Sequence, residues 1–362
     1  MTAASLEGFS SYVREVDGEC LFVRVVDNFL FCGSRSGDVA CWDICSGTEL
    51  WRLSFEGPCT DSDFDDGVFF FTESENVHAI QVDSGGLIWS TKLEGSSDFI
   101  VVSNDFVWVT SSVYNFEIQD YSEGSVWQIN LEGEVRNRWD VEGRAWSLLN
   151  QDGKLVLGLS RPNSGYAIVS DNGLEFPDMR QQEPVTVGNG GGSGPVVLGH
   201  GNGMVSKIVD HTIESVSQFD SSVQAIDYFC GWVVGLDSGE VASSIDYDSW
   251  SVKLGGMIDV LCFGPSLDSE RGVWVPSWRD GGTVIFLINP NGGNVELQIF
   301  HKSRIVSAFS DEEVICFGDA DGCVFVIEGE VLRRRFAQPM EEVSDEDRRS
   351  ELRRKIRRLR GS

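Results

Sequence analysis

A short pattern, G-x-x-x-G-x-V, recurs along this chain of 362 residues and constrains its fold more than any other feature. Complete copies occupy residues 33–39, 199–205, 235–241 and 318–324. Each copy lies between two apolar runs, which are typical of strands. The pattern therefore predicts a hairpin, with glycine in the turn because the turn needs a positive φ.

Weaker copies of the pattern fill the gaps between the complete ones, and the spacing is regular. The turn positions fall at residues 37, 75, 124, 165, 203, 239, 282 and 322, about 41 residues apart, which is typical of propeller blades. We therefore predict an all-β fold, an eight-bladed β-propeller of four-stranded antiparallel blades, with seven blades as the alternative. The predicted blades lie at about 20–56, 58–95, 98–142, 144–180, 184–220, 222–254, 257–300 and 303–336.

An eleven-residue motif marks the outer edge of two blades. Residues 41–51 and 79–89 share it, and residues 287–297 form a looser copy. The motif resembles the quinoprotein-type (PQQ-like) propeller repeat, A-x-D-x-x-T-G-x-x-x-W, and Trp42-Asp43 after a glycine turn also resembles the WD repeat. The resemblance covers roughly residues 20–336. It implies structural docking residues at Trp51, Trp89, Asp43, Gly47 and Gly85, with each tryptophan against the neighbouring blade.

Charge is distributed unevenly in this chain, which has a net charge of −29. The first 340 residues are strongly acidic, which argues against nucleic acid binding over the main surface. No apolar run is long enough to span a membrane, and residues 1–8 do not resemble a secretory signal. Nine scattered cysteines without a C-x-x-C pair favour buried thiols over disulfides or a zinc site. We expect a cytoplasmic protein.

No catalytic constellation stands out in the sequence. Residues 61–67 superficially resemble a calcium loop, but a solvated turn between strands is favoured. The glycine-rich run 188–194 is interpreted as a flexible loop within blade five. Four dispersed histidines do not favour a metal triad, and His78 is expected to be a strand residue with a satisfied ring. We predict no catalytic residues, no metal ligands and no cofactor.

Two insertions interrupt the repeat, at residues 111–124 and 264–272. The first carries Tyr114, Phe116 and Tyr121 near acidic residues. Long loops on a repeated scaffold often form its binding surface, although neutral drift of loop length is an equal alternative. We take these three aromatic residues as candidate partner-binding residues.

The C-terminal tail differs in character from the rest of the chain. Ser344 suits a helix N-cap, and Leu352, Ile356 and Leu359 then form an apolar stripe among basic residues. We predict a short basic amphipathic helix from about residue 345, with candidate binding residues Arg353, Arg354, Lys355, Arg357 and Arg358. It would bind an acidic partner, nucleic acid or anionic lipid, or else remain a solvated tail.

The predicted organisation is an N-terminal segment at 1–19 that could add a ring-closing strand, a propeller at 20–336 and the tail at 337–362. The expected function is a non-enzymatic, monomeric scaffold that binds unidentified protein partners. Two alternatives remain open: a quinone- or calcium-dependent oxidoreductase, and an assembly factor resembling the propeller lipoprotein of outer-membrane assembly.

Overall fold

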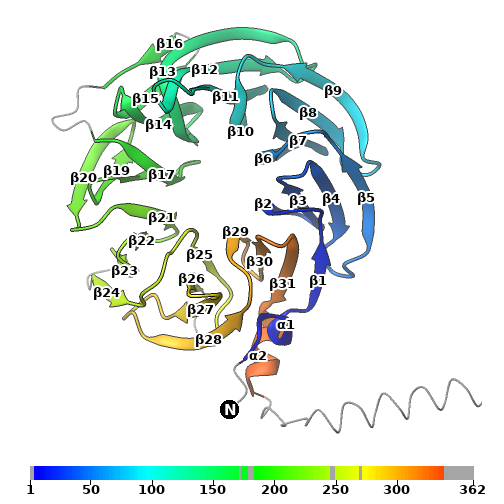
Figure 1. Cartoon of the computed structure of the whole chain (residues 1–362), viewed down its shortest axis with the longest axis vertical. Helices are drawn as coiled ribbons and strands as arrows, with labels where there is room; N and C mark the ends of the chain where they lie inside the picture. The colour runs from blue at the N-terminus through cyan, green and yellow to red at the C-terminus, as the bar shows by residue number, and fades with distance from the viewer. Residues whose placement is uncertain (1–3, 171–172, 178–182, 245–248, 269–270, 338–362) are drawn as a thin grey trace, which may run out of the picture.

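Antiparallel sheets arranged in a ring form this molecule, as Figure 1 shows. The computed structural model describes residues 4–170, 173–177, 183–244, 249–268 and 271–337. Six of the sheets have four strands, and the seventh has seven. The predicted all-β propeller is confirmed.

The strands follow one another around the ring in chain order. The first sheet comprises β2 (Cys20–Val26), β3 (Phe29–Ser34), β4 (Asp38–Asp43) and β5 (Glu49–Ser54). The second comprises β6 (Cys59–Asp65), β7 (Val68–Glu73), β8 (Asn76–Gln81) and β9 (Gly86–Lys92). The seven-stranded sheet comprises β10 (Ser96–Ser103), β11 (Phe106–Asn115), β12 (Asp120–Asn130), β13 (Val135–Gln151), β14 (Lys154–Pro162), β15 (Gly165–Ser170) and β16 (Gly173–Glu175).

Four further sheets complete the ring. They comprise β17 (Val185–Gly190), β18 (Val196–His200), β19 (Met204–Val209) and β20 (Thr212–Gln218); β21 (Val223–Tyr228), β22 (Trp232–Leu236), β23 (Glu240–Ser243) and β24 (Trp250–Lys253); and β25 (Cys262–Gly264), β26 (Gly272–Arg279), β27 (Gly282–Ile288) and β28 (Val295–His301). The last contains β29 (Ile305–Ser310), β30 (Val314–Asp319), β31 (Cys323–Glu328) and β1 (Tyr12–Glu15).

Strand β13 joins two four-stranded units. Its residues 135–142 pair with β12, and its residues 143–151 pair with β14. The sequence interpretation divided the chain here into separate blades at 142 and 144. One strand runs through this boundary, and Gly143, with a φ of +84°, bends it where the pairing partner changes. With β13 divided between two units, the pairings form eight four-stranded groups.

The last sheet takes its outer strand from the opposite end of the chain. Tyr12 of β1 pairs with Val326 of β31, and Glu15 pairs with Cys323. Residues 303–336 thus provide only three strands of the last blade, and the N-terminal segment, for which the sequence left a ring-closing strand open, provides the fourth. After Glu328 the chain forms helix α2 (Gly329–Ala337) instead of a fourth strand.

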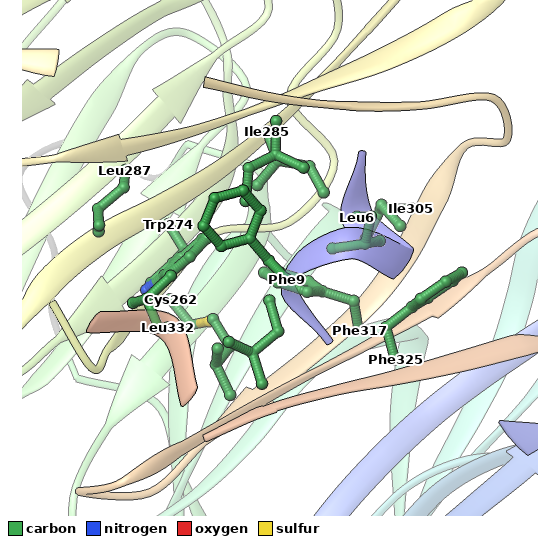
Figure 2. Packing of buried hydrophobic residues seen from close by; sticks show 13 residues of the cluster. Leu6, Phe9, Cys262, Trp274, Ile285, Leu287, Ile305, Phe317, Phe325 and Leu332 are labelled. Atoms are coloured by element: carbon green, nitrogen blue, oxygen red, sulfur yellow. The ribbon is translucent and has the colours of Figure 1, made fainter. Parts of the chain in front are cut away.

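Both ends of the described chain pack onto one apolar cluster beside the last two sheets, as Figure 2 shows. Helix α1 (Leu6–Phe9) contributes Leu6 and Phe9, and α2 contributes Leu332. These three side chains surround Trp274 and Phe317 from the sheets. The Arg335 guanidinium of α2 also donates to the backbone oxygens of Gly8 and Ser10. Helices α1 and α2 thus pack together on one side of the ring.

The rest of the core lies between neighbouring sheets. Between the first two sheets, Phe31 and Phe69 stack with ring centroids 4.2 Å apart. Similar apolar clusters follow around the ring. Because adjacent sheets share their buried faces, the position of each sheet is fixed by its neighbours.

Candidate interaction face and contacts between blades

Trp51 lies on β5 and packs against the turn between β8 and β9 of the next sheet. Its indole is 8% exposed, and its Nε1 donates to the Val82 carbonyl oxygen at 2.5 Å. In that turn Gly85 has a φ of +67°, and a Cβ atom on it would lie 2.7 Å from Cγ of Trp51. Glycine is required there both for the turn and for the close approach of the ring.

The same contact recurs around the ring. The half-buried Trp89 donates to the Leu131 oxygen at 2.8 Å and lies against Gly133. Trp250 donates to the Pro290 oxygen at 2.6 Å and lies against Gly293. The sequence analysis did not identify Trp250.

Gly47 occupies the equivalent turn of the first sheet, and there the contacting side chains are not tryptophans. Tyr12 of β1 donates to the Ile44 oxygen at 2.7 Å, and Arg14 donates to the Gly47 oxygen at 2.6 Å. Asp43 holds the turn itself, because Ser46 donates to its carboxylate from both the backbone nitrogen and the hydroxyl, each at 2.7 Å. These bonds lower the pKa of Asp43.

Carboxylates on the inner strands connect neighbouring sheets nearer the ring axis. Asp61 and Asp63 of β6 accept from the backbone nitrogens of Ile100 and Val102, at 3.0 and 2.7 Å. Asp227 of β21 accepts from that of Phe263 at 2.8 Å. The interpretation of residues 61–67 as a solvated turn was thus wrong for residues 61–65, which belong to strand β6; only residues 66–67 make the turn.

Burial raises the pKa of Asp227 to about 6, although backbone hydrogen bonds from Phe263 and Tyr228 and the charge of Arg271 act in the opposite direction. The folded protein therefore holds this proton more tightly than the unfolded chain. The stabilisation that results is complete below about pH 4 and is lost as the pH rises through 6. The side chain of Asp227→Asn cannot ionise. We predict that the free energy of unfolding of this variant falls less between pH 5 and 7.5 than that of the wild type, with a difference on the order of 1–2 kcal/mol. Urea unfolding at both pH values measures this, and parallel pH profiles would contradict it.

The first insertion forms a long hairpin, not a loop. Strands β11 and β12 pair as far as Asn115 and Asp120, so only residues 116–119 make the turn. Asn115 Oδ1 accepts from the Glu117 nitrogen at 2.9 Å, and Gln119 adopts a φ of +54°. At the tip Phe116 is 85% exposed and Ile118 is 60% exposed.

Aromatic rings continue from this tip toward the ring axis. Tyr114 makes edge contacts with both Phe116 and Tyr121, each with ring centroids 5.2 Å apart. Tyr121 in turn meets Trp146 of β13 edge-on at 6.4 Å. The structure therefore brings together the three aromatic residues of the insertion and adds a fourth, Trp146, which the sequence analysis did not identify.

Arg144 fixes the inner end of this aromatic row. Its guanidinium carbon lies 4.8 Å from the Tyr121 ring centroid and 4.6 Å from that of Trp146. It also donates to the Tyr121 hydroxyl at 2.8 Å and pairs with Asp98 at 2.7 Å. Two aromatic contacts and a partly buried ion pair hold the base of the hairpin rigid.

The neighbouring part of this face is acidic. A hollow of about 750 Å³ lies at the turn between β7 and β8, which is equivalent to the hairpin turn of the next sheet. Glu56, Glu73 and Glu75 line it. Glu117 and Asp120 flank the hairpin tip. An exposed apolar tip beside carboxylates suits a partner with apolar and basic side chains.

The remaining predicted residues do not join this face. His78 is buried on β8 with Nε2 3.4 Å from Glu73, but its Nδ1 has no partner among the described atoms, so the expectation of a satisfied ring was wrong. The described residues contain no group of three or more potential metal ligands. The predicted tail helix, with Arg353, Arg354, Lys355, Arg357 and Arg358, lies outside the described residues.

Comparison with known proteins agrees with this architecture. The sequence model of a family described as "Outer membrane protein assembly factor BamB" matches residues 35–173. No curated protein matches the sequence significantly. Among the helices of the described chain, none is long and apolar enough to cross a membrane.

Solved structures match over most of the chain at low sequence identity. Sqt1 from Saccharomyces cerevisiae has a TM-score of 0.72 and 13% identity, covering 90% of this chain and 99% of its own. The computationally designed Ika8 has a TM-score of 0.69 and 17% identity, and the match covers 87% of this chain and 98% of its own. BamB from Moraxella catarrhalis has a TM-score of 0.65 and 14% identity, and the match covers 88% of this chain and 99% of its own. The chain is a β-propeller whose residues 35–173 are similar to the BamB-type repeat family.

Proposed function

We propose that this protein is a non-enzymatic scaffold that binds another protein through the face that carries the β11–β12 hairpin. The observation that carries the proposal is the exposed tip, Phe116 and Ile118, on a hairpin whose base is held by Arg144. Large rigid side chains bind with little loss of conformational entropy, and they are frequent among residues that dominate binding energy. The acidic hollow beside the hairpin supports a partner surface that is basic around an apolar centre.

The proposal includes three further features: a compartment, a second contact and a monomeric state. Six of the nine cysteines are buried thiols, which suits a reducing compartment such as the cytoplasm. The basic tail at 348–362 is a second proposed contact, toward an acidic surface of a partner. We also propose that the chain acts as a monomer.

The match of residues 35–173 favours one second candidate, a role in protein assembly like that described for the BamB family. Partners identified by affinity purification would separate this role from other scaffolds, since it requires membrane proteins or their assembly machinery among them. The oxidoreductase alternative requires stoichiometric quinone or calcium in the purified protein.

We predict that the double variant Phe116→Ser/Ile118→Ser weakens binding of the purified partner at least tenfold, because each buried apolar anchor contributes about 1 kcal/mol or more. The matched control is Leu87→Ser/Ile88→Ser, which changes two exposed apolar residues on the outer strand β9. Titration calorimetry with the partner captured from the native host measures both. Equal affinities for the wild type and the hairpin variant would contradict the proposed face.

A further inference from the structure

A cavity of about 450 Å³ lies among the innermost strands of the ring. Strands β2, β6, β10, β13 and β17 contribute its lining, and Figure 1 shows several of these strands closest to the ring axis. This volume is within the usual range for small-ligand sites.

Glycines line one wall of this cavity. Strand β17 ends at Gly190, and Gly192 follows; both line the cavity with positive φ, +88° and +65°. A Cβ atom on Gly192 would meet nothing within 4 Å, so the space beside it is empty. The interpretation of residues 188–194 as a flexible loop was wrong for Gly188–Gly190, which pair with β18 as part of the inner strand.

Charge in the cavity is unbalanced. Its lining contains two carboxylates, Asp61 and Asp63, but only one cationic side chain, Arg24. Arg24 pairs with Asp63 at 3.1 Å. Asp61 accepts from the backbone nitrogens of Ser62 and Ile100, at 2.8 and 3.0 Å, and forms no ion pair with any described residue.

The surroundings of Asp61 disfavour its negative charge. Burial raises the pKa of Asp61 to about 6, in spite of the charge of Arg24 and two backbone hydrogen bonds. At neutral pH the carboxylate is therefore ionised in a site that disfavours its charge. A cation placed beside it would be attracted more strongly than at an exposed carboxylate.

The aromatic row leads from the hairpin to this cavity. Trp146, which Tyr121 contacts edge-on, also lines the cavity, and Phe99 of β10 lines it nearby. Aromatic faces attract organic cations, which suits a ligand whose charge is carried on an apolar stem. A row of contacting aromatic rings thus runs from the hairpin to a residue that lines the cavity.

We propose that this cavity binds an organic cation, the head group of a basic side chain from a segment held by the hairpin face. This inference deepens the proposed function and rests on it for the source of the side chain. Asp61 pairs with the cation, while Trp146 and Phe99 contact its stem. Asn150 and Asn189 also line the cavity, and their Oδ1 atoms accept from the backbone nitrogens of Gly153 and Gly190. Each amide oxygen has a second lone pair for the remaining N–H groups of the ligand.

The test uses the full chain and three probes: the peptide acetyl-Gly-Arg-Gly-amide, its neutral counterpart with citrulline in place of arginine, and agmatine. Backbone amide shifts of Gly188, Gly190 and Gly192 report binding at the cavity. We expect the arginine peptide to shift these signals at pH 7.5 and to bind at least tenfold more tightly than the citrulline peptide. If both peptides bind equally, or neither shifts these glycines, the proposal is wrong.

Asp61→Asn should weaken binding of the arginine peptide at least tenfold, because the amide can still accept from Ile100 but carries no charge. Asp65→Asn, at the exposed end of the same strand, is the matched control and should bind as the wild type does. An unaltered affinity in Asp61→Asn would overturn the role of this carboxylate. If agmatine binds as tightly as the peptide, the cavity recognises an organic cation, and the ligand can be a free small molecule instead of a side chain.

The short probes also keep this test separate from the proposed function. They do not reach the hairpin tip, so Phe116→Ser/Ile118→Ser should bind the arginine peptide normally. If the hairpin variant loses partner binding but the arginine peptide does not bind at the cavity, the scaffold face is supported and the cation site is contradicted. If the arginine peptide binds at the cavity but the hairpin variant binds the partner as the wild type does, the cation site is supported and the scaffold face is contradicted.

Discussion

A chain that lacks residues 1–18 is expected to lose most of its stability and to fail to form a closed monomeric ring. The deletion removes β1, which completes the last sheet, and it removes Leu6 and Phe9 from the cluster in Figure 2. Loss of two buried side chains of this size costs about 5–10 kcal/mol, which is comparable to the whole stability of a typical domain. The unpaired edge of β31 would also promote aggregation.

Complementation measures this expectation directly. The truncated chain is mixed with a synthetic peptide of residues 4–18, and size-exclusion chromatography and thermal unfolding are recorded. The peptide should restore a monomer, whereas a scrambled peptide should not. A truncated chain that is monomeric and unfolds at the wild-type temperature would show that β1 is dispensable.

Trp51→Ala is expected to lower the free energy of unfolding by roughly 3–5 kcal/mol. The substitution leaves a void against Gly85 and removes the hydrogen bond to the Val82 oxygen. The same cluster includes Phe31, whose ring centroid lies 6.0 Å from that of Trp51, so the void opens onto the core between two sheets. Equilibrium unfolding in urea measures the loss.

Two further variants separate the causes of this loss. Trp51→Phe keeps an aromatic ring but loses the N–H donor, so it should cost less than Trp51→Ala. Trp89→Ala removes a tryptophan with the same role that is only half buried, so its cost should be smaller. A cost below 1 kcal/mol for Trp51→Ala would show that this contact does not hold the blades together.

The repeat was predictable because its turns require glycine. Gly37, Gly203, Gly239 and Gly322 all have positive φ, and these are the second glycines of the four complete sequence copies. The structure also places the tryptophans of the two good motif copies at contacts between blades. A residue type that backbone geometry demands leaves a periodic signal, even where the rest of the blade has diverged.

Features that depend on distant contacts left no such signal. Trp139 follows Gly133 after five intervening residues, whereas Trp51 and Trp89 follow their glycines after three, so the third blade did not match the motif. The pairing of β1 with β31 joins opposite ends of the chain. Local patterns cannot specify such a partner.

The hairpin at the candidate face was mistaken for a loop because its turn contains no glycine. Gln119 adopts the positive φ there, and the Asn115 side chain supports the turn. Asn115 was the signal that could have identified it, since asparagine often begins such turns. Trp146 could not be assigned to the face from the sequence, because its contact with Tyr121 depends on the fold.

The meeting of the two ends of the chain has a consequence for biosynthesis. Residues 12–15 are synthesised roughly 310 residues before their partners at 323–326. At about 5–20 residues per second, the interval is on the order of tens of seconds. During that time the nascent ring stays open, with Leu6 and Phe9 lacking their native neighbours. Chaperone protection of the N-terminal segment would therefore be most valuable during translation, before the final sheet exists.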